Sequence, residues 1–173
     1  MKKALFLSFI MMFACLLLQA QEEEQATYFN EIYQYSLSYP KSWEGEENEE
    51  NGTATFYVPL QEGETVYKQL QISVARWEEG DLNDFLQATF IEDDLRKLFP
   101  DITIRDLGGF NSTDKETHSF ELNYTMNEEK ITTLYYMQKT ADIVCIILAE
   151  SPQNEYAVYK EKYLEIISSL IIH

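Results

Sequence analysis

The residues that most directly suggest chemistry are Ser119, His118 and Asp114, because nucleophilic catalysis by serine needs a hydroxyl, a base and an orienting carboxylate. They lie on or just before the strand around Phe120, where Phe120, Leu122, Tyr124 and Met126 alternate with polar residues. Adjacent strand residues point to opposite faces, so His118 and Ser119 are poorly placed to form a hydrogen-bonded pair. We therefore predict no catalytic triad. His118, which shares the parity of Phe120, is expected to point inward or to lie at the rim of the sheet.

Carboxylates offer a second kind of chemistry, the binding of a cation. Their densest group consists of Glu44, Glu46, Glu47, Glu49 and Glu50. Calcium sites use several oxygen ligands, but the Asp-x-Asp-x-Asp-Gly spacing of a calcium loop is absent, and runs of glutamate usually remain solvated. We predict an acidic surface turn over residues 44–52 and no metal site, although the sequence leaves open whether a cation binds residues 44–50.

The segment Asp81-Leu82-Asn83-Asp84 also resembles part of a calcium loop. Helix capping explains it more simply: Asp81 is a good N-cap, and Asp84 places negative charge in the first helical turn, where the helix dipole favours it. No nucleotide-binding glycine motif, zinc-ligand spacing or Gly-x-Ser-x-Gly occurs in the chain. We therefore predict a protein that is not an enzyme and that has no catalytic, cofactor-binding or metal-binding residues. Three Asn-x-Thr sequons, at Asn51, Asn111 and Asn123, matter only in a host that glycosylates them.

The charge of the chain restricts its partners. Thirteen basic and thirty acidic residues among 173 give a net charge of −17. A surface of this kind repels phosphate backbones and anionic lipid headgroups, so we predict that the protein binds neither nucleic acid nor the membrane surface.

The first twenty residues have the pattern of a secretion signal. Lys2 and Lys3 precede an uncharged apolar run, 4–18, which is too short to span a membrane, and we place cleavage after Ala20. The alternative is a lipoprotein anchored through Cys15, but the apolar run continues past that cysteine. We therefore favour export to the periplasm or the medium, without membrane insertion after cleavage. Cys145 would then be the single cysteine of the mature chain, packed as a small hydrophobic residue without a disulfide partner.

Hydrophobic periodicity defines the elements that position these side chains. We expect a disordered acidic lead-in over 21–27 and a single domain over 28–173. Alternating or β-branched segments predict strands at 35–39, 53–58, 69–75, 102–107, 120–126, 131–138 and 143–149. An apolar stripe predicts one helix over 81–98. Ser151-Pro152 predicts the start of a second helix, whose stripe runs from Tyr156 to Leu170. Short connections late in the chain require antiparallel pairing, so the predicted fold class is α+β, an antiparallel sheet sandwiched by helices.

A short motif near the start of this domain carries a resemblance. The segment Tyr35-Ser-Leu-Ser-Tyr39-Pro40-Lys-Ser-Trp43 resembles the opening of PsbP-like domains, in which a strand runs into an aromatic-Pro-x-x-Trp corner. The order of the later elements matches as well, over about residues 28–172. The resemblance implies an antiparallel sheet sandwiched by helices. It also implies a binding or accessory role without a shared active site, as in the extrinsic photosystem II subunit, bacterial envelope proteins and a relative that binds the Ran GTPase.

The corner also has an interpretation that does not depend on the family. Pro40 fixes φ and has no amide donor, so the strand ends there, and Trp43 can fold back over the sheet edge or the last helix. We predict that Tyr39, Pro40 and Trp43 are structural and that Trp43 lies in the core.

Tyrosines provide the remaining candidate site. The neighbours Tyr135 and Tyr136 must point to opposite faces of one strand, which indicates either two covered faces or an exposed aromatic patch. Our first hypothesis for function is an exported, non-catalytic accessory protein that binds another envelope protein. The alternative is a carrier of an apolar small molecule or lipid, in a cavity lined by Tyr124, Tyr135 or Tyr136. The oligomeric state is open.

Overall fold

The computed structural model describes residues 23–48, 52–112 and 114–173. The predicted leader with Cys15, the carboxylates Glu49 and Glu50, and the sequon at Asn51 lie outside these residues. The parts of the chain that are described contain no helix long and apolar enough to cross a membrane.

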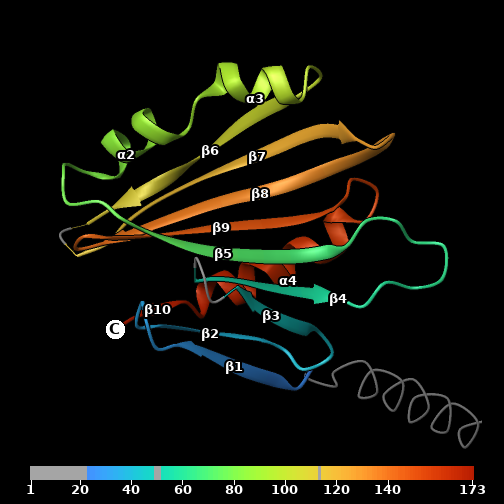
Figure 1. The fold of residues 1–173 in the computed structure, drawn as a ribbon, viewed down its shortest axis with the longest axis horizontal. Helices are drawn as coiled ribbons and strands as arrows, with labels where there is room; N and C mark the ends of the chain where they lie inside the picture. The colour runs from blue at the N-terminus through green and yellow to red at the C-terminus, as the bar shows by residue number, and fades with distance from the viewer. Residues whose placement is uncertain (1–22, 49–51, 113) are drawn as a thin grey trace, which may run out of the picture.

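Most of the described chain forms two antiparallel sheets (Figure 1). The larger consists of β3 (Glu44–Asn48), β4 (Thr53–Val58), β5 (Lys68–Arg76), β6 (Thr103–Asn111), β7 (Glu116–Met126), β8 (Glu129–Thr140) and β9 (Ile143–Pro152). Its strand order is β3-β4-β5-β9-β8-β7-β6. We call it the main sheet. The smaller, which we call the minor sheet, has the order β1-β2-β10 and consists of β1 (Gln25–Asn30), β2 (Tyr35–Pro40) and β10 (Ile171–Ile172).

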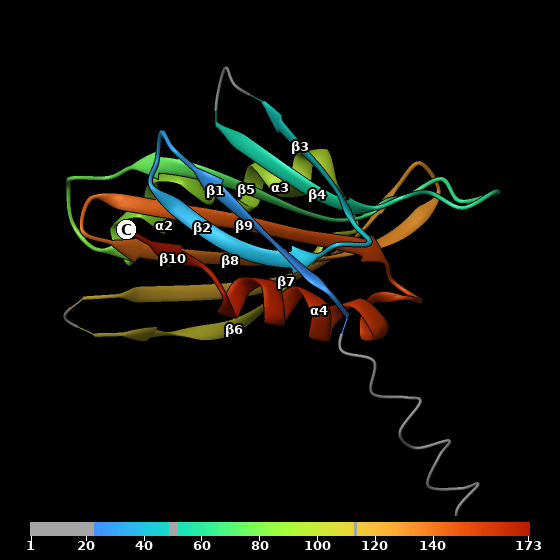
Figure 2. The ribbon, with the colours of Figure 1, turned by 90° about the horizontal axis from the view of Figure 1, so that it is seen from below.

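Three described helices complete the fold: α2 (Leu82–Thr89), α3 (Glu92–Leu98) and α4 (Tyr156–Ser168). In Figure 2, β1 and β2 cross in front of the main sheet, whereas α2 and α3 lie behind it. One face of the main sheet is thus covered by the minor sheet together with α4, and the other by α2. The fold is therefore mostly antiparallel sheet with a few helices. We had predicted that helices alone cover the main sheet, but the minor sheet covers much of one face.

The principal core lies between the main sheet, the minor sheet and α4. Trp43 is buried there, with its ring centroid 6.0 Å from that of Tyr163 and 6.5 Å from that of Tyr159, both on α4. The Trp43 amide donates to the Pro40 carbonyl at 2.9 Å, which closes the turn after β2. The predicted core position of Trp43 is confirmed, and the ring packs against the C-terminal helix. Cys145 is fully buried in the same core, and burial raises the pKa of its thiol to about 12.

The second core is smaller and lies under α2. Its buried members are Leu82, Phe85, Leu86, Met137 and Val144. The cap that we predicted at the start of α2 is present: the Asp84 amide donates to Asp81 Oδ1 at 2.9 Å, and the Asp81 amide donates to Asp84 Oδ2 at 3.2 Å.

Two predicted irregular segments are strands. Residues 25–27, which we had placed in a disordered lead-in, form the first half of β1 and pair with residues 38–40. Residues 44–48, predicted as part of an acidic turn, form β3, all of whose side chains are exposed. The sequence did not predict this strand because its glutamates are typical of a turn. A solvated edge strand tolerates such charges, whereas a buried strand does not.

Neither of the two predicted helices has the bounds that the sequence indicated. The stripe over 81–98 is divided between α2 and α3 because Phe90 leaves the helix and its ring stacks on Phe120 at 4.7 Å. Ser151 and Pro152 do not start a helix. They extend β9, opposite Thr132 and Ile131 of β8, and α4 begins four residues later. The pairing of β9 with β5 ends at Glu150, so within the described residues the missing amide of Pro152 interrupts no second ladder.

The strand predicted over 102–107 continues to Asn111 in β6, with a β-bulge before Gly108. The register with β7 shifts between Asp106 and Gly108, and Gly108 has φ +78°. A Cβ on Gly109 would lie 1.9 Å from the Thr117 carbonyl oxygen, so only glycine allows the two strands to approach this closely.

Candidate functional site

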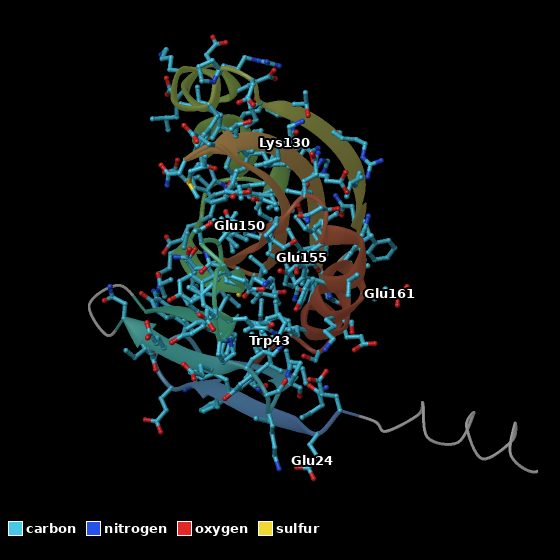
Figure 3. The ribbon with its side chains drawn as sticks, turned by 90° about the vertical axis from the view of Figure 1, so that its right-hand side faces the viewer. Glu24, Trp43, Lys130, Glu150, Glu155 and Glu161 are labelled. Atoms are coloured by element: carbon cyan, nitrogen blue, oxygen red, sulfur yellow. The ribbon has the colours of Figure 1, made fainter. Side chains whose placement is uncertain are left out.

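A concave region among the described residues lies at one end of the main sheet, and we call it the loop-end cleft. The loop between β4 and β5, the turn between β7 and β8, and the end of β9 surround it. Its larger hollow measures about 400 Å³ and its smaller hollow about 180 Å³, and both include Thr65, Val66 and Glu129 in their walls. Figure 3 faces this end of the molecule and labels Glu150 and Glu155.

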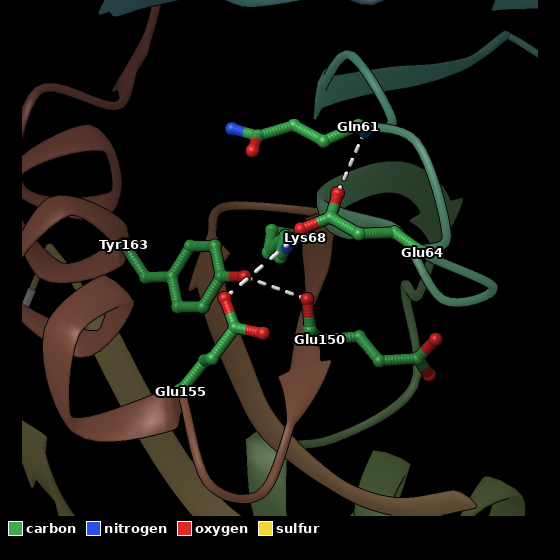
Figure 4. Close-up of polar contacts among 6 residues, drawn as sticks. All are labelled: Gln61, Glu64, Lys68, Glu150, Glu155 and Tyr163. Atoms are coloured by element: carbon green, nitrogen blue, oxygen red, sulfur yellow. Dashed lines mark hydrogen bonds and ion pairs between the residues drawn. The ribbon is translucent and has the colours of Figure 1, made fainter.

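Lys68 is the buried cation beside the smaller hollow (Figure 4). Only 3% of its side chain is exposed; its Nζ donates to Glu64 and lies 3.5 Å from Glu155 Oε2. Burial alone would lower the pKa of Lys68, but the hydrogen bond to Glu64 and the charge of Glu155 outweigh burial and raise that pKa. Glu64 also accepts from the Gln61 amide at 2.9 Å, and this bond, followed by that from Lys68, lowers the pKa of Glu64. The lysine is thus matched by carboxylates and holds the β4–β5 loop to the end of the sheet.

Glu150 is the carboxylate fixed most firmly in the wall of the larger hollow. Its Oε2 accepts from the Tyr124 hydroxyl at 2.7 Å and from Thr133 Oγ1 at 3.4 Å, and its Oε1 accepts from Gln69 Nε2 at 3.5 Å. Burial, with a smaller contribution from Glu150, raises the pKa of the Tyr124 hydroxyl. These three donors are neutral, so the contacts orient the carboxylate without neutralising it.

Glu128 and Glu129 add further negative charge at the turn between β7 and β8. Both are exposed and line the larger hollow. Asn127 and Glu128 have φ of 52° and 71°, the left-handed conformation of a tight hairpin turn. Within the described ranges, no ion pair within 4.0 Å involves Glu128, Glu129 or Glu150. The larger hollow is therefore suited to a cationic group.

Sequence reasoning missed the buried lysine, although a signal for it existed. Lys68 has the same parity as Leu70 and Ile72 in β5, so its side chain had to enter the core side of the sheet. A lysine at such a position predicts a buried carboxylate partner. The identity of that partner depended on the path of the β4–β5 loop, which periodicity does not determine.

Two of the residues considered for a triad, His118 and Ser119, have other hydrogen-bond partners. His118 Nε2 lies 2.9 Å from Asp106 Oδ1, a partner on β6 that the sequence did not indicate. The Ser119 hydroxyl donates to the Gly108 carbonyl at 3.2 Å. As expected for adjacent strand residues, Ser119 and His118 lie on opposite faces of β7. Among the described residues, no hydrogen bond links His118 to Asp114.

The acidic run is also divided. Glu46 accepts from the Tyr57 hydroxyl at 2.9 Å, whereas the neighbouring Glu47 accepts from Asn30 Nδ2 at 3.0 Å. The part of the chain that the structure describes contains no group of three or more metal-ligating side chains. Residues Asn111 and Asn123 lie on β6 and β7, and Asn123 Oδ1 accepts from Thr132 Oγ1 at 2.7 Å.

The paired tyrosines are both engaged in packing. Tyr135 lies 5.5 Å from the Phe90 ring on the α2 side, and Tyr136 packs on the principal core at the opposite face. Tyr124 packs its ring 4.3 Å from that of Phe99. Of the two interpretations of the tyrosine pair, the structure favours two covered faces.

Comparison with known proteins shows similarity in fold only. No protein-family model matches the sequence, and no curated protein matches it significantly. The solution structure of cyanobacterial PsbP from Synechocystis has a TM-score of 0.66 at 11% identity, over 89% of this chain and 95% of that chain. LpqN, involved in cell envelope biogenesis of Mycobacterium tuberculosis, has a TM-score of 0.57 at 11% identity, over 87% and 85%. A protein from Bacteroides thetaiotaomicron has a TM-score of 0.57 at 15% identity, over 87% of this chain but 49% of that one, so this chain spans about half of that protein. The chain therefore has a PsbP-like fold.

Proposed function

We propose that this protein is an exported, non-catalytic binding module of the cell envelope. Its partner is another protein, which places a lysine or arginine side chain in the loop-end cleft. The leader pattern supports export, and the fold is similar to PsbP and to an envelope-biogenesis protein. The observation that carries the proposal is the uncompensated negative charge of Glu128, Glu129 and Glu150 around a hollow of about 400 Å³.

A basic side chain is the group that this geometry fits best. Glu150 is held in place by neutral donors, so the hollow does not have to reorganise when a cation enters. The exposed Glu128 and Glu129 lie at the rim, where they would attract a positively charged segment and accelerate its association. The alternative of an apolar carrier has less support, because Tyr135 and Tyr136 pack on other side chains and Tyr124 borders a hollow of about 190 Å³ that it shares with Asp101 and Lys130.

Charge reversal at the rim tests the proposal. The double variant Glu128→Lys, Glu129→Lys is expressed in the native host next to a matched control, Glu161→Lys, whose exposed carboxylate lies on α4 away from the cleft (Figure 3). Each protein carries a photoreactive residue at Tyr67, which lines the cleft, and crosslinked proteins are identified by mass spectrometry.

We expect one envelope protein to crosslink to the unmodified cleft, with yield reduced about tenfold in the double variant and unchanged in Glu161→Lys. Equal melting temperatures show that the variants remain folded. The proposal is wrong if no protein crosslinks, or if the double variant retains the same partner at the same yield. Recovery of an apolar small molecule instead of a protein would support the carrier.

A further inference from the structure

Among the described residues, the outer side of β1 is a regular strand edge without a partner strand. In the minor sheet, β2 lies between β1 and β10, so β1 is paired on one side only among the described residues. All six of its residues pair with β2 in unbroken register. Strand edges of this kind expose backbone amides and carbonyls that another extended segment can use.

The hydrogen bonds at the two ends of β2 show which backbone groups of β1 point outward. The Lys41 amide donates to the Glu24 carbonyl at 2.8 Å, so the position just before β1 bonds toward β2. On the other side of β2, the His173 amide donates to the Gln34 carbonyl at 2.8 Å, so Gln34 bonds toward β10 and Tyr35 toward β1.

Along an antiparallel strand, the backbone groups of successive residues bond alternately to the strand on one side and to the other side. The two observations above agree on which residues of β1 bond to β2. Residues 26, 28 and 30 bond inward to β2. The amides and carbonyls of Gln25, Thr27 and Phe29 therefore point away from it. Pro40, which has no amide to donate, is the partner of Gln25 in a pair that needs no such bond.

The other long edges are protected, whereas β1 is not. The outer edge of β3 carries Glu44, Glu46 and Glu47, and the outer edge of β6 is interrupted by its bulge. Charges and bulges are common means by which proteins prevent strand addition. β1 has the sequence Gln-Ala-Thr-Tyr-Phe-Asn, without a charge, a proline or a bulge.

We infer that the β1 edge binds an extended segment of the partner protein by strand addition, with an uncharged centre and basic ends. This inference rests on the proposed function, because it supplies the second contact of the same partner. Phe29, 47% exposed, shares the outer face of the minor sheet with Ile171, 55% exposed, since Ser36 pairs with both. An apolar side chain of the added strand would pack beside Phe29.

Charge decides between a partner and a second copy of this chain. Each copy carries a net charge of −17, and antiparallel pairing of two β1 strands centred on Thr27, in which outward residues face outward residues, would place Glu23 beside Glu31 of the second copy. These residues flank the uncharged strand at its two ends. Like charges directly opposite one another destabilise a strand pair, whereas the net negative charge of this chain would attract a foreign segment that carries lysine or arginine at its ends.

A defined peptide tests the edge directly. The probe is Lys-Lys-Val-Thr-Val-Thr-Val-Lys-Lys, and its control is the same peptide with N-methyl groups on alternate central residues, which removes backbone donors but not charge. The protein variants are Thr27→Pro, which removes an outward amide and no bond to β2, and Thr27→Ala as the matched control. Affinity is measured by calorimetry, and amide exchange is followed residue by residue.

We expect the N-methylated peptide and Thr27→Pro each to weaken binding about tenfold or more, and Thr27→Ala to weaken it less than about twofold. The probe should slow exchange of the Thr27 and Phe29 amides, whereas the inward amide of Tyr28 is already protected by β2. If Thr27→Pro does not fold, the N-methylated peptide decides the question on the unmodified protein.

The inference is overturned if the probe does not bind, if N-methylation has no effect, or if protection appears at β6 instead. A dimer that depends on Thr27 would show that the occupant is a second copy and would also overturn it. These results leave the proposed function standing as long as the cleft still crosslinks a protein, so the two failures can be distinguished.

Discussion

The two faces of the main sheet are covered very differently. On one face, the minor sheet and α4 enclose sixteen buried hydrophobic residues among those described, and α4 alone contributes Tyr156, Tyr163, Ile166 and Ile167. On the other face, α2 encloses a cluster with five buried members, and α3 buries none of its residues. Buried apolar area is the main source of stability, so the first face holds the domain together.

The difference indicates two levels of stability within one fold. Regions with few buried apolar contacts open locally at a lower free energy than the whole domain. We therefore expect α2 and α3 to detach while the main sheet, the minor sheet and α4 remain folded. The predictions below run from the largest expected effect to the smallest, and each would contradict or sharpen this comparison.

The largest effect is expected at Trp43, in the principal core. Trp43→Ala should reduce the free energy of unfolding by about 4–5 kcal/mol, because it empties a large aromatic site against Tyr159 and Tyr163. Trp43→Phe should be much milder. Urea unfolding curves measure both, and an unchanged midpoint in Trp43→Ala would show that this ring contributes little to the core.

Phe85 is the corresponding test on the other face. Its ring lies 5.4 Å from that of Trp77, at 78° between the planes. Phe85→Ala should cost about 3 kcal/mol, near the lower end for such substitutions, because the surrounding cluster is small and can partly collapse. Amide exchange should accelerate in α2 but not in α4. Equal acceleration in both helices would mean that the two covers unfold as one unit.

The cap of α2 should have a smaller effect. Asp81→Ala removes the acceptor for the Asp84 amide and should cost about 1 kcal/mol. Asp81→Asn keeps an acceptor and should cost less. Thermal denaturation compares the two variants; similar losses would show that the charge, and not the hydrogen bond, matters.

A still smaller effect, dependent on pH, is expected where the start of the described chain meets α4. Glu23 Oε2 lies 2.7 Å from Lys162 Nζ, and Glu23 Oε1 accepts from Ser42 Oγ at 2.6 Å. These bonds, that from Lys162 first, lower the pKa of Glu23 from 4.5. Because the folded state has the lower pKa, the contribution is complete above about pH 5 and is lost as the pH falls through that lowered value.

Both side chains are about one-third exposed, so solvent and salt screen the pair, and Glu23→Gln should cost about 0.5 kcal/mol or less at pH 7. The difference between the two proteins should disappear once the pH is below the lowered pKa of Glu23, and it should shrink in 1 M salt. A difference that persists in acid would assign the effect to packing.

The smallest effect is expected at Leu98, the last residue of α3, which is 71% exposed. Leu98→Ser should change the free energy of unfolding by less than about 0.5 kcal/mol, as is typical for surface positions. A larger loss in a denaturant titration would show that α3 is held to the sheet by more than its buried surface indicates.

Sequence patterns predicted the strands whose side chains alternate between core and solvent. β5 and the aromatic strand β4 were found because one of their faces enters the principal core. Two strands that lack a regular alternation of buried and exposed residues in the sequence were not predicted. Every residue of β3 is exposed, and the first half of β1 lies in the acidic segment 21–27. The helix start predicted at Ser151-Pro152 was wrong. These residues pair with β8, and this pairing depends on tertiary structure, which the local sequence does not determine.

The candidate site was less predictable than the fold. The tyrosine, threonine and glutamine that hold Glu150 come from β7, β8 and β5, so only strand order brings them together. Charge composition predicted an acidic surface but not its location at the end of the sheet. Helix capping at Asp81 was predictable because it is decided within four residues.

Because Cys145 is buried only in the folded protein, the reactivity of its thiol reports when the core closes during folding. Its raised pKa keeps it protonated, and the packed core keeps oxidants away from it. A newly made chain has neither protection, so oxidation of the thiol competes with closure of the core. A pulse of thiol reagent during refolding would therefore time the docking of the minor sheet and α4, and the same reagent would leave Cys145 of the folded protein unmodified.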